Sequence, residues 1–258
     1  MGKVADRKQS MVELLSEKGK LTVGDVAAYY GISMPTARKM CSALEAEGLA
    51  IRTHGGIRCE PSGRQKYSFD LLTFENINEK KRIGRYAASL LESNKTVFFE
   101  AGTTVMQCVI SFAERIKSNE LRNMVVFTNS LRNLEIIHPV CCVNLIGGEY
   151  RDDRKDFVGY ISESVLTSLH FDYCFIGADG VNLEHGAMAM DMETARFDRE
   201  LLNYSEKAIL LADSGKFGKR SLLSIASVDE YSSIITDDAL GDEVYNQYRD
   251  RYIDLVRV

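Results

Sequence analysis

Long apolar runs are absent from this sequence. No segment approaches the roughly 18 uninterrupted apolar residues of a membrane-spanning helix. Residues Met1 to Arg7 lead into an amphipathic segment and lack the apolar core of a secretory signal. We therefore expect neither a membrane protein nor an exported one, and we predict a cytoplasmic location.

Spacings typical of metal sites and nucleotide-binding loops are absent as well. The 6 cysteines include no Cys-x-x-Cys pair, and the 4 histidines are scattered. Neither a Gly-x-x-x-x-Gly-Lys-Ser/Thr nor a Gly-x-Gly-x-x-Gly motif occurs, so we expect no metal and no cofactor. Cys141 and Cys142 fall in a run that predicts a buried strand, which favours reduced core thiols.

Charge is present but unevenly distributed. A chain of 258 residues predicts two unequal domains. Residues 1–66 hold 11 Lys and Arg against 7 Asp and Glu, a net charge of +4, and the remainder holds 21 against 30, a net of −9. A small basic head on an acidic body indicates that only the head binds a polyanion.

The head, residues 1–59, has the pattern of a winged helix-turn-helix domain. The apolar spacing of Met11, Leu14 and Leu15 predicts a first helix. Thr22 can cap a second helix, and Ser33 a third that runs to about residue 47. Between and after these helices lie turn glycines and two strand-like runs, at 49–53 and 57–59, that flank His54-Gly55-Gly56 and predict a hairpin, the wing.

Polar and basic residues lie on the outer side of the predicted third helix. A recognition helix needs such groups near its N-terminal half, where they meet base edges and phosphates of double-stranded DNA. The alternative is that they are solvated charges on a small helical domain. The predicted DNA contacts, with those of the hairpin, are Ser33, Thr36, Arg38, Lys39, Ser42, Arg52, His54 and Arg58.

The head carries a series of short motifs: the stretch from Ser33 to Lys39, then Leu44-Glu45, Gly48-Leu49 and Arg52-Thr53-His54-Gly55-Gly56. In these motifs the head resembles that of the DeoR-type repressors of sugar metabolism. That family's helix commonly reads Ser-x-x-Thr-Ile-Arg-Arg-Asp-Leu, whereas this chain has Ala37, Lys39, Met40 and Cys41 at the Ile, second Arg, Asp and Leu. The resemblance implies DNA binding but no particular operator, because lysine does not replace arginine at a bidentate contact.

The body, residues 75–258, follows a linker at 60–74 and alternates apolar runs with helical stretches. The predicted strands are 96–100, 124–128, 140–146, 171–176, 208–212, 233–236 and 253–256. Continuous apolar strands separated by helices predict an α/β fold with a mainly parallel sheet covered by helices on both faces.

Small, polar and glycine-rich loops follow these strands, at the edge where α/β sheets bind ligands. Glycine lets a ligand approach the backbone, and a helix N-terminus offers N–H groups to a phosphate. Arg151 and Lys216 can supply positive charge, and Asp179 and Glu193 can accept hydrogen bonds from sugar hydroxyls. The predicted effector-binding residues are Gly102, Thr103, Thr104, Asn129, Ser130, Gly148, Arg151, Asp179, Glu193 and Lys216.

The same loops also resemble those of the DeoR-type regulators, in the same order. The body of these regulators is similar to ribose-5-phosphate isomerase, which implies that Gly102-Thr103-Thr104 and Lys216 hold a phosphate and that Asp179 and Glu193 lie near sugar carbons. The resemblance further implies a homo-oligomer and a phosphorylated sugar or polyol effector that weakens operator binding.

The rival interpretation is a working sugar-phosphate isomerase fused to a DNA-binding head. Enediolate chemistry needs a positioned base and a cation. In the isomerases a catalytic lysine follows the aspartate within a glycine-rich stretch, whereas residues 183–190 contain neither Lys nor Arg. Glu193 retains a carboxylate, and His185 is the one alternative proton carrier. We therefore expect a regulator and not an enzyme.

Overall fold

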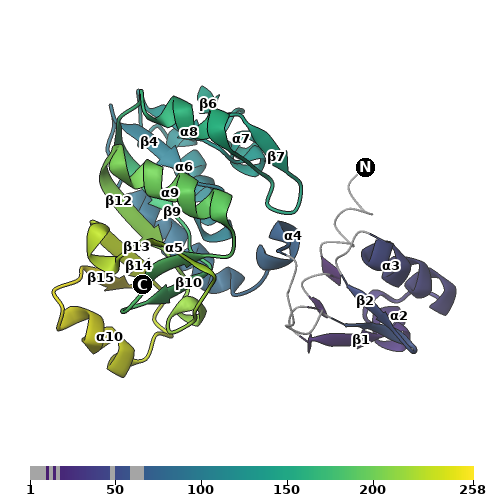
Figure 1. Ribbon diagram of the computed structural model, residues 1–258. Coiled ribbons are helices and arrows are strands. Elements are labelled where there is room, and N and C mark those ends of the chain that lie inside the picture. The colour runs from purple at the N-terminus through teal and green to yellow at the C-terminus, as the bar shows by residue number, and fades with distance from the viewer. Residues whose placement is uncertain (1–9, 12–13, 16–17, 47–49, 59–66) are drawn as a thin grey trace. The chain divides into compact units, whose positions relative to one another are not determined.

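The computed structural model describes residues 10–11, 14–15, 18–46, 50–58 and 67–258. The chain divides into two compact units (Figure 1). The first, residues 1–77, contains the head, and the second, residues 78–258, contains nearly all of the body. Each unit has its own apolar core.

The head is a winged helix-turn-helix domain, as predicted. The described residues at 10–11, 14–15 and 18 are helical. They are followed by β1 (Lys20–Thr22), α2 (Val23–Tyr30), α3 (Met34–Ala46), β2 (Ile51–Thr53) and β3 (Gly56–Arg58). The strands form an antiparallel sheet in the order β1-β3-β2, and the helices bury their apolar sides against it. The sequence pattern does not predict the strand β1, which has three residues.

Local side chains explain where the helices of the head begin and end. Thr22 caps α2 by accepting the Asp25 N–H at 3.0 Å, and Asp25 accepts the Thr22 N–H at 2.8 Å. Gly31 ends α2 with φ at 60°, a conformation that favours glycine. Several predicted positions lie outside the described residues: the end of the third helix at 47–48, the first and last residues of the wing runs, Leu49 and Cys59, and residues 60–66 of the linker.

A short helix, α4 (Phe69–Leu72), lies within the stretch that the sequence predicts as a linker. The Ser68 hydroxyl accepts the Leu71 N–H at its start. Leu71 and Phe74 pack against the apolar core of the head. This helix has four residues, three apolar and one acidic. Four residues are too few to show helical periodicity, so the sequence pattern does not predict the helix.

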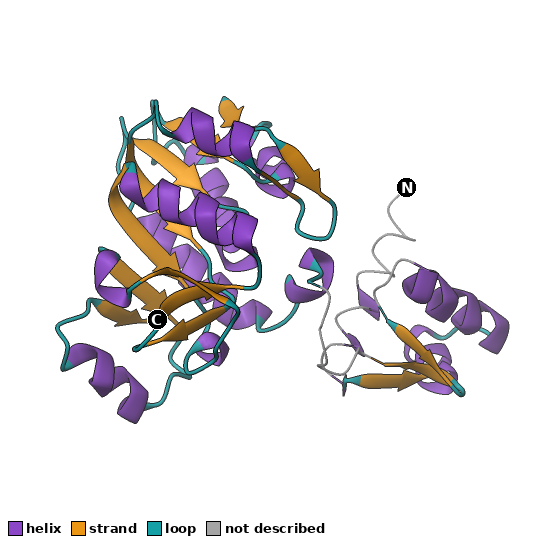
Figure 2. Cartoon of the chain, viewed as in Figure 1, coloured by secondary structure: helices purple, strands orange, loops and turns teal. Residues whose placement is uncertain are grey.

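A seven-stranded parallel sheet forms the centre of the body, in the order β15-β14-β12-β9-β4-β5-β6 (Figure 2). Each of the seven strands overlaps a predicted one. Their bounds are β4 (Thr96–Phe99), β5 (Val125–Thr128), β6 (Val143–Leu145), β9 (Phe171–Ile176), β12 (Ser205–Leu211), β14 (Ser233–Thr236) and β15 (Leu255–Arg257).

One detail of the strand prediction is wrong. The third strand begins at Val143, so Cys141 and Cys142 precede it in a bend, and Cys142 is exposed. The helix before them, α7 (Leu131–Ile137), is followed by a turn at residues 138–140, and this turn includes Val140, the first residue that the prediction gave to the strand.

Helices cover both faces of the sheet, as predicted. Alternate strand residues point to opposite faces, so Phe98 and Cys174 lie in one apolar layer, whereas Phe99 and Phe175 lie in the other. The first layer includes residues of α8 (Tyr160–Leu166), α9 (Met192–Asn203) and α10 (Asp242–Arg249). The second includes residues of α5 (Ile77–Ser89), α6 (Thr103–Lys117) and α7.

Two small antiparallel elements were not predicted. The hairpin of β7 (Glu149–Arg151) and β8 (Asp156–Val158) follows β6. A three-stranded sheet combines two parts of the chain: β10 (Gly180–Asn182) and β11 (Gly186–Ala189) come after β9, and β13 (Leu223–Ala226) comes after β12. These five strands have three or four residues each, which is too short for a clear alternation of apolar and polar residues. Among the described residues no helix is long and apolar enough to cross a membrane.

Candidate functional site

The outer side of α3 gathers the polar residues that the sequence assigned to DNA. Ala37, Cys41 and Leu44 are buried on the inner side. Helical spacing therefore turns the intervening residues outward, and Ser33, Thr36, Arg38, Lys39 and Ser42 are all exposed. The hydroxyls of Ser33 and Thr36 lie 2.9 Å apart at the start of the helix. The result is one continuous polar and basic surface.

The hairpin divides its three candidates between its two faces. Arg52 pairs in register with Ile57, which is fully buried, so Arg52 shares the inner face. Burial raises the pKa of the Cys41 thiol, and the nearby Arg52 guanidinium acts in the opposite direction. Arg58 lies on the other face, in register with Lys20, and His54 is exposed in the turn. The structure thus separates Arg52 from the other predicted DNA contacts.

The body presents the N-terminus of α6 at the carboxyl end of β4. Gly102 is the N-cap of this 15-residue helix, and no side chain caps it. Thr103 and Thr104 form its first turn and are buried. A Cβ on Gly102 would lie 3.4 Å from the Gly177 Cα, so the loops after β4 and β9 approach each other closely. An uncapped helix N-terminus with adjacent hydroxyls can bind an anion.

Glu100, which the sequence analysis did not place in the site, holds these two loops together. Its Oε2 accepts the Gly102 N–H at 2.8 Å and the Gly177 N–H at 3.2 Å. Burial raises the pKa of Glu100 to about 7, and the Asp156 charge adds to the increase, while the two backbone N–H groups oppose it. Asp198, on the inner side of α9, is also buried, and burial together with the Glu100 charge raises its pKa.

The β7–β8 hairpin is joined to α9 by an arginine that the sequence assigned to the ligand. Arg151 donates two bonds to Asp156, at 2.9 and 2.5 Å, and one to Asp191 at 2.7 Å. It also donates to the Thr194 hydroxyl at 2.8 Å. Its positive charge is therefore compensated within the protein.

A second arginine of the hairpin, Arg154, was missed. It is buried, with its guanidinium 2.9 Å from Asp191 and 3.5 Å from Asp179. Asp179 also accepts the Met190 N–H at 2.8 Å through the same oxygen. The run Arg-Asp-Asp-Arg-Lys-Asp at 151–156 has the composition of a solvated turn, and no sequence pattern distinguishes the buried arginines from the exposed charges.

The other candidates divide between packing and surface positions. Asn129 and Ser130 are buried, where Asn129 donates to the Phe157 carbonyl at 3.2 Å and Ser130 caps α7. A Cβ on Gly148 would lie 2.2 Å from the Ser162 hydroxyl, so this glycine serves close packing. Glu193 is exposed on the first turn of α9, and Lys216 is half-buried in a short 3-10 helix (Ser214–Lys216). Asp179 and Arg151 therefore belong to one ionic network, because Arg154 contacts both Asp179 and Asp191, and Asp191 also pairs with Arg151. Glu193, in contrast, is exposed to solvent.

A basic, exposed helix-turn-helix surface and a separate α/β unit with an uncapped helix at the carboxyl edge of its sheet define a ligand-responsive DNA-binding protein. Residues 7–62 match the DeoR-like helix-turn-helix domain, and residues 75–238 match the DeoR C terminal sensor domain. The chain belongs to the DeoR family of transcriptional regulators.

Curated relatives match the chain along nearly its whole length. The HTH-type transcriptional regulator GlpR of Haloferax volcanii is 31% identical over 237 residues, which are 92% of this chain and 91% of the relative. The lactose phosphotransferase system repressor of Streptococcus mutans is 29% identical over 262 residues, 97% of this chain and 98% of the relative. A ribose 5-phosphate isomerase from Plasmodium falciparum superposes with a TM-score of 0.42 at 16% identity, over 55% of this chain and 54% of the isomerase.

Proposed function

We propose that this protein represses a carbohydrate-utilisation operon and that a phosphorylated sugar or polyol lowers its affinity for the operator. The observation that carries the proposal is the pairing of an exposed basic α3 in the head with an uncapped α6 N-terminus in an acidic body. The relatives include one named as the lactose phosphotransferase system repressor. A regulator of this kind acts in the cytoplasm.

The head, residues 1–59, makes the proposed contacts with double-stranded operator DNA. Ser33, Thr36, Arg38, Lys39 and Ser42 meet the DNA from α3, and His54 and Arg58 from the wing. Arg52, on the inner face of the hairpin, supports the wing instead of contacting DNA. Because lysine and arginine contacts with phosphate release counterions, operator affinity falls steeply with salt concentration.

The effector occupies the carboxyl edge of the parallel sheet. The proposed phosphate site is the first turn of α6, at Gly102, Thr103 and Thr104, with Lys216 as the cation. Asp179 is oriented by the Met190 N–H and by Arg154, so its carboxylate is held ready to accept hydrogen bonds from sugar hydroxyls. The ionic network of Arg151 fixes the hairpin that borders this edge.

Coupling between the two units runs through the linker, residues 60–74, and through the contacts between copies of the body, residues 75–258. Two heads on one duplex fit the usual spacing of helix-turn-helix dimers, so the active form is a homo-oligomer. A ligand shifts the DNA-bound state only if it binds the bound and free states unequally. Useful coupling is about 1–3 kcal/mol, or roughly 5–150-fold in operator affinity.

The body performs no isomerase turnover in this proposal. No lysine or arginine lies between residues 183 and 190, Glu193 is exposed, and Asp179 is engaged by Arg154. Multiple turnover on pentose or hexosamine phosphates by the purified protein, abolished in Glu193→Gln, would contradict a purely regulatory role.

Operator affinity with and without effector tests the proposal. Duplexes selected in vitro from a random pool serve as the operator, and a thermal-shift screen of sugar phosphates identifies the effector by the rise in melting temperature. We expect the effector to weaken operator binding by the wild type but not by Lys216→Ala. Lys219→Ala, an exposed neighbour, is the matched control and should respond like the wild type. A full response by Lys216→Ala would remove Lys216 from the phosphate site.

A further inference from the structure

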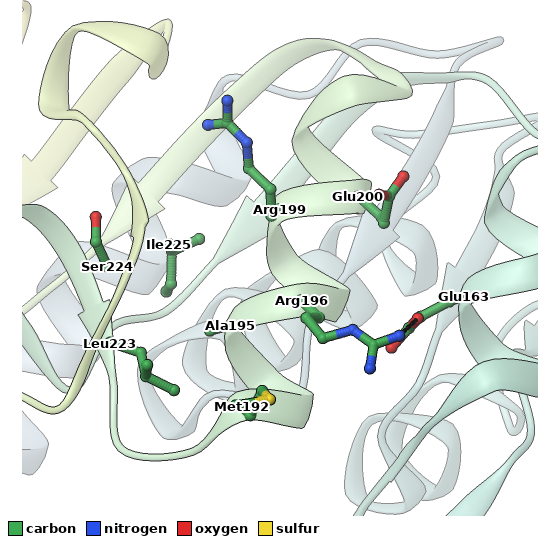
Figure 3. Close-up of a pocket in the computed structure, with 9 residues that line it drawn as sticks. All are labelled: Glu163, Met192, Ala195, Arg196, Arg199, Glu200, Leu223, Ser224 and Ile225. Carbon is green, nitrogen blue, oxygen red and sulfur yellow. Dashed lines mark hydrogen bonds and ion pairs between the residues drawn. The ribbon is translucent and has the colours of Figure 1, made fainter.

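A groove of about 380 Å³ runs between α9 and β13, outside the site described above (Figure 3). Met192, Ala195 and Arg196 line it from α9, and Leu223 and Ile225 line it from β13. Figure 3 shows Met192 and Leu223 at the same end of the groove, with the paired Arg196 and Glu163 on the side of α8.

Apolar side chains are exposed at this end of the groove. Leu222 is 75% exposed, Met192 is 59% exposed, and Met190 is partly exposed. Ala189 pairs with Leu223 across β11 and β13, so the residues next to this pair, Met190 and Leu222, follow at the same end of the two strands. The exposed Leu222 therefore lies beside a hollow whose near end is lined by Met192 and Leu223. Exposed apolar clusters of this kind mark contact surfaces.

The charges around the groove are balanced. Arg196 pairs with Glu163 at 2.5 Å, and Arg199 pairs with Glu230. Glu200 is the remaining charged lining residue, so the lining residues themselves comprise two arginines and two glutamates. A surface without net charge does not attract nucleic acid or a strongly charged peptide. It can bind a partner whose positive and negative charges are equal in number.

From this projection, this hollow and this charge balance we infer that the groove is the contact between two copies of the body. In a two-fold interface the same patch meets itself, so it must carry both a projection and its complement. Leu222 of each copy enters the groove of the other, beside Met192. β13 is an edge strand, with β11 as its one hydrogen-bonded neighbour among the described residues, and this edge faces the second copy. The inference rests on the proposed function, which needs paired heads.

The mass of the protein in solution tests this interface. Sedimentation equilibrium on the full chain should show a dimer or a multiple of it. Leu222→Glu places a charge at the apolar end of the second copy's groove and should raise the dimer dissociation constant about 100-fold or more. Leu222→Met should leave it unchanged. Tyr252→Glu, at a side chain that is 98% exposed outside the groove, is the matched control and should behave like the wild type.

The outcomes separate this inference from the proposed function. A monomeric wild type, or an unchanged dimer in Leu222→Glu with a native circular dichroism spectrum, overturns the interface. Dimers that dissociate as expected in a protein that binds no selected duplex support the interface and refute the regulatory proposal.

Discussion

Replacement of Glu100 by glutamine should change how the stability of the body depends on pH. Glutamine keeps the oxygen that accepts the N–H groups of Gly102 and Gly177, and its uncharged amide removes the titration. The two proteins therefore differ in the charge at this position but not in the shape of the site.

The magnitude follows from the pKa. Burial raises the pKa of Glu100 from 4.5 to about 7, a difference worth on the order of 3 kcal/mol. A carboxyl group with a raised pKa stabilises the folded state in its protonated form. That contribution is complete below pH 4.5 and is lost as the pH rises through 7, because the unfolded chain releases the proton first. Glu100→Gln should match the wild type near pH 4.5 and exceed its stability by a few kcal/mol at pH 8.

Urea unfolding followed by circular dichroism measures this difference, since the chain has no tryptophan to report by fluorescence. The head contributes equally to both proteins and cancels in the comparison. Glu149→Gln, at an exposed residue of β7, controls for loss of any carboxylate and should leave the pH profile of the wild type unchanged. Parallel profiles for Glu100→Gln and the wild type from pH 4.5 to 8 would refute the reasoning.

Three further predictions concern the head, the ionic network and the thiols. Arg38→Ala should weaken operator binding by about 1–3 kcal/mol without changing the circular dichroism spectrum; equal affinity in a gel-shift titration, alongside Arg122→Ala on the body as control, would exclude a base contact. Arg151→Met removes the arginine that donates two hydrogen bonds to buried Asp156 and should cost about 3–5 kcal/mol in urea unfolding, whereas Arg132→Met, which breaks a surface ion pair with Glu135, should cost about 0–1 kcal/mol; similar losses in both would show that the network carries no special energy. Maleimide should label exposed Cys142 before Cys174, because Cys174 is buried and burial raises its pKa to about 12; mass spectrometry of the peptides would reveal the opposite order if Cys142 were protected.

The sequence predicts the parallel sheet well and the antiparallel additions poorly. Inner strands such as β4 and β14 are short, continuous apolar runs because they are buried on both faces, and such a run is visible without knowledge of its neighbours. The three-residue strands of the β7–β8 hairpin leave no comparable pattern. Cys141 and Cys142 were misplaced for a related reason. Apolar residues that directly precede a strand have the same composition as the strand itself, so the sequence pattern does not show where the strand begins.

The candidate sites show the same limit at the level of single side chains. Helical spacing was enough to place Arg38 and Lys39 on the outer side of α3. The face of Arg52 depends on its register with Ile57, and the partners of Arg154 come from residues 25 and 37 positions away. Register and long-range ion pairs are set by tertiary structure, so neither can be read from a local pattern.

The attachment of the β7–β8 hairpin bears on how this family can diverge. The hairpin forms its own two-stranded sheet and adds no strand to the seven-stranded one, and side chains such as Arg151 join it to α9. The turn between Arg151 and Asp156 can therefore gain or lose residues without altering the register of any core strand. In the proposed effector site, a change in this turn alters the surroundings of Asp179, because Arg154 of the turn contacts that carboxylate, while the scaffold beneath it is inherited intact.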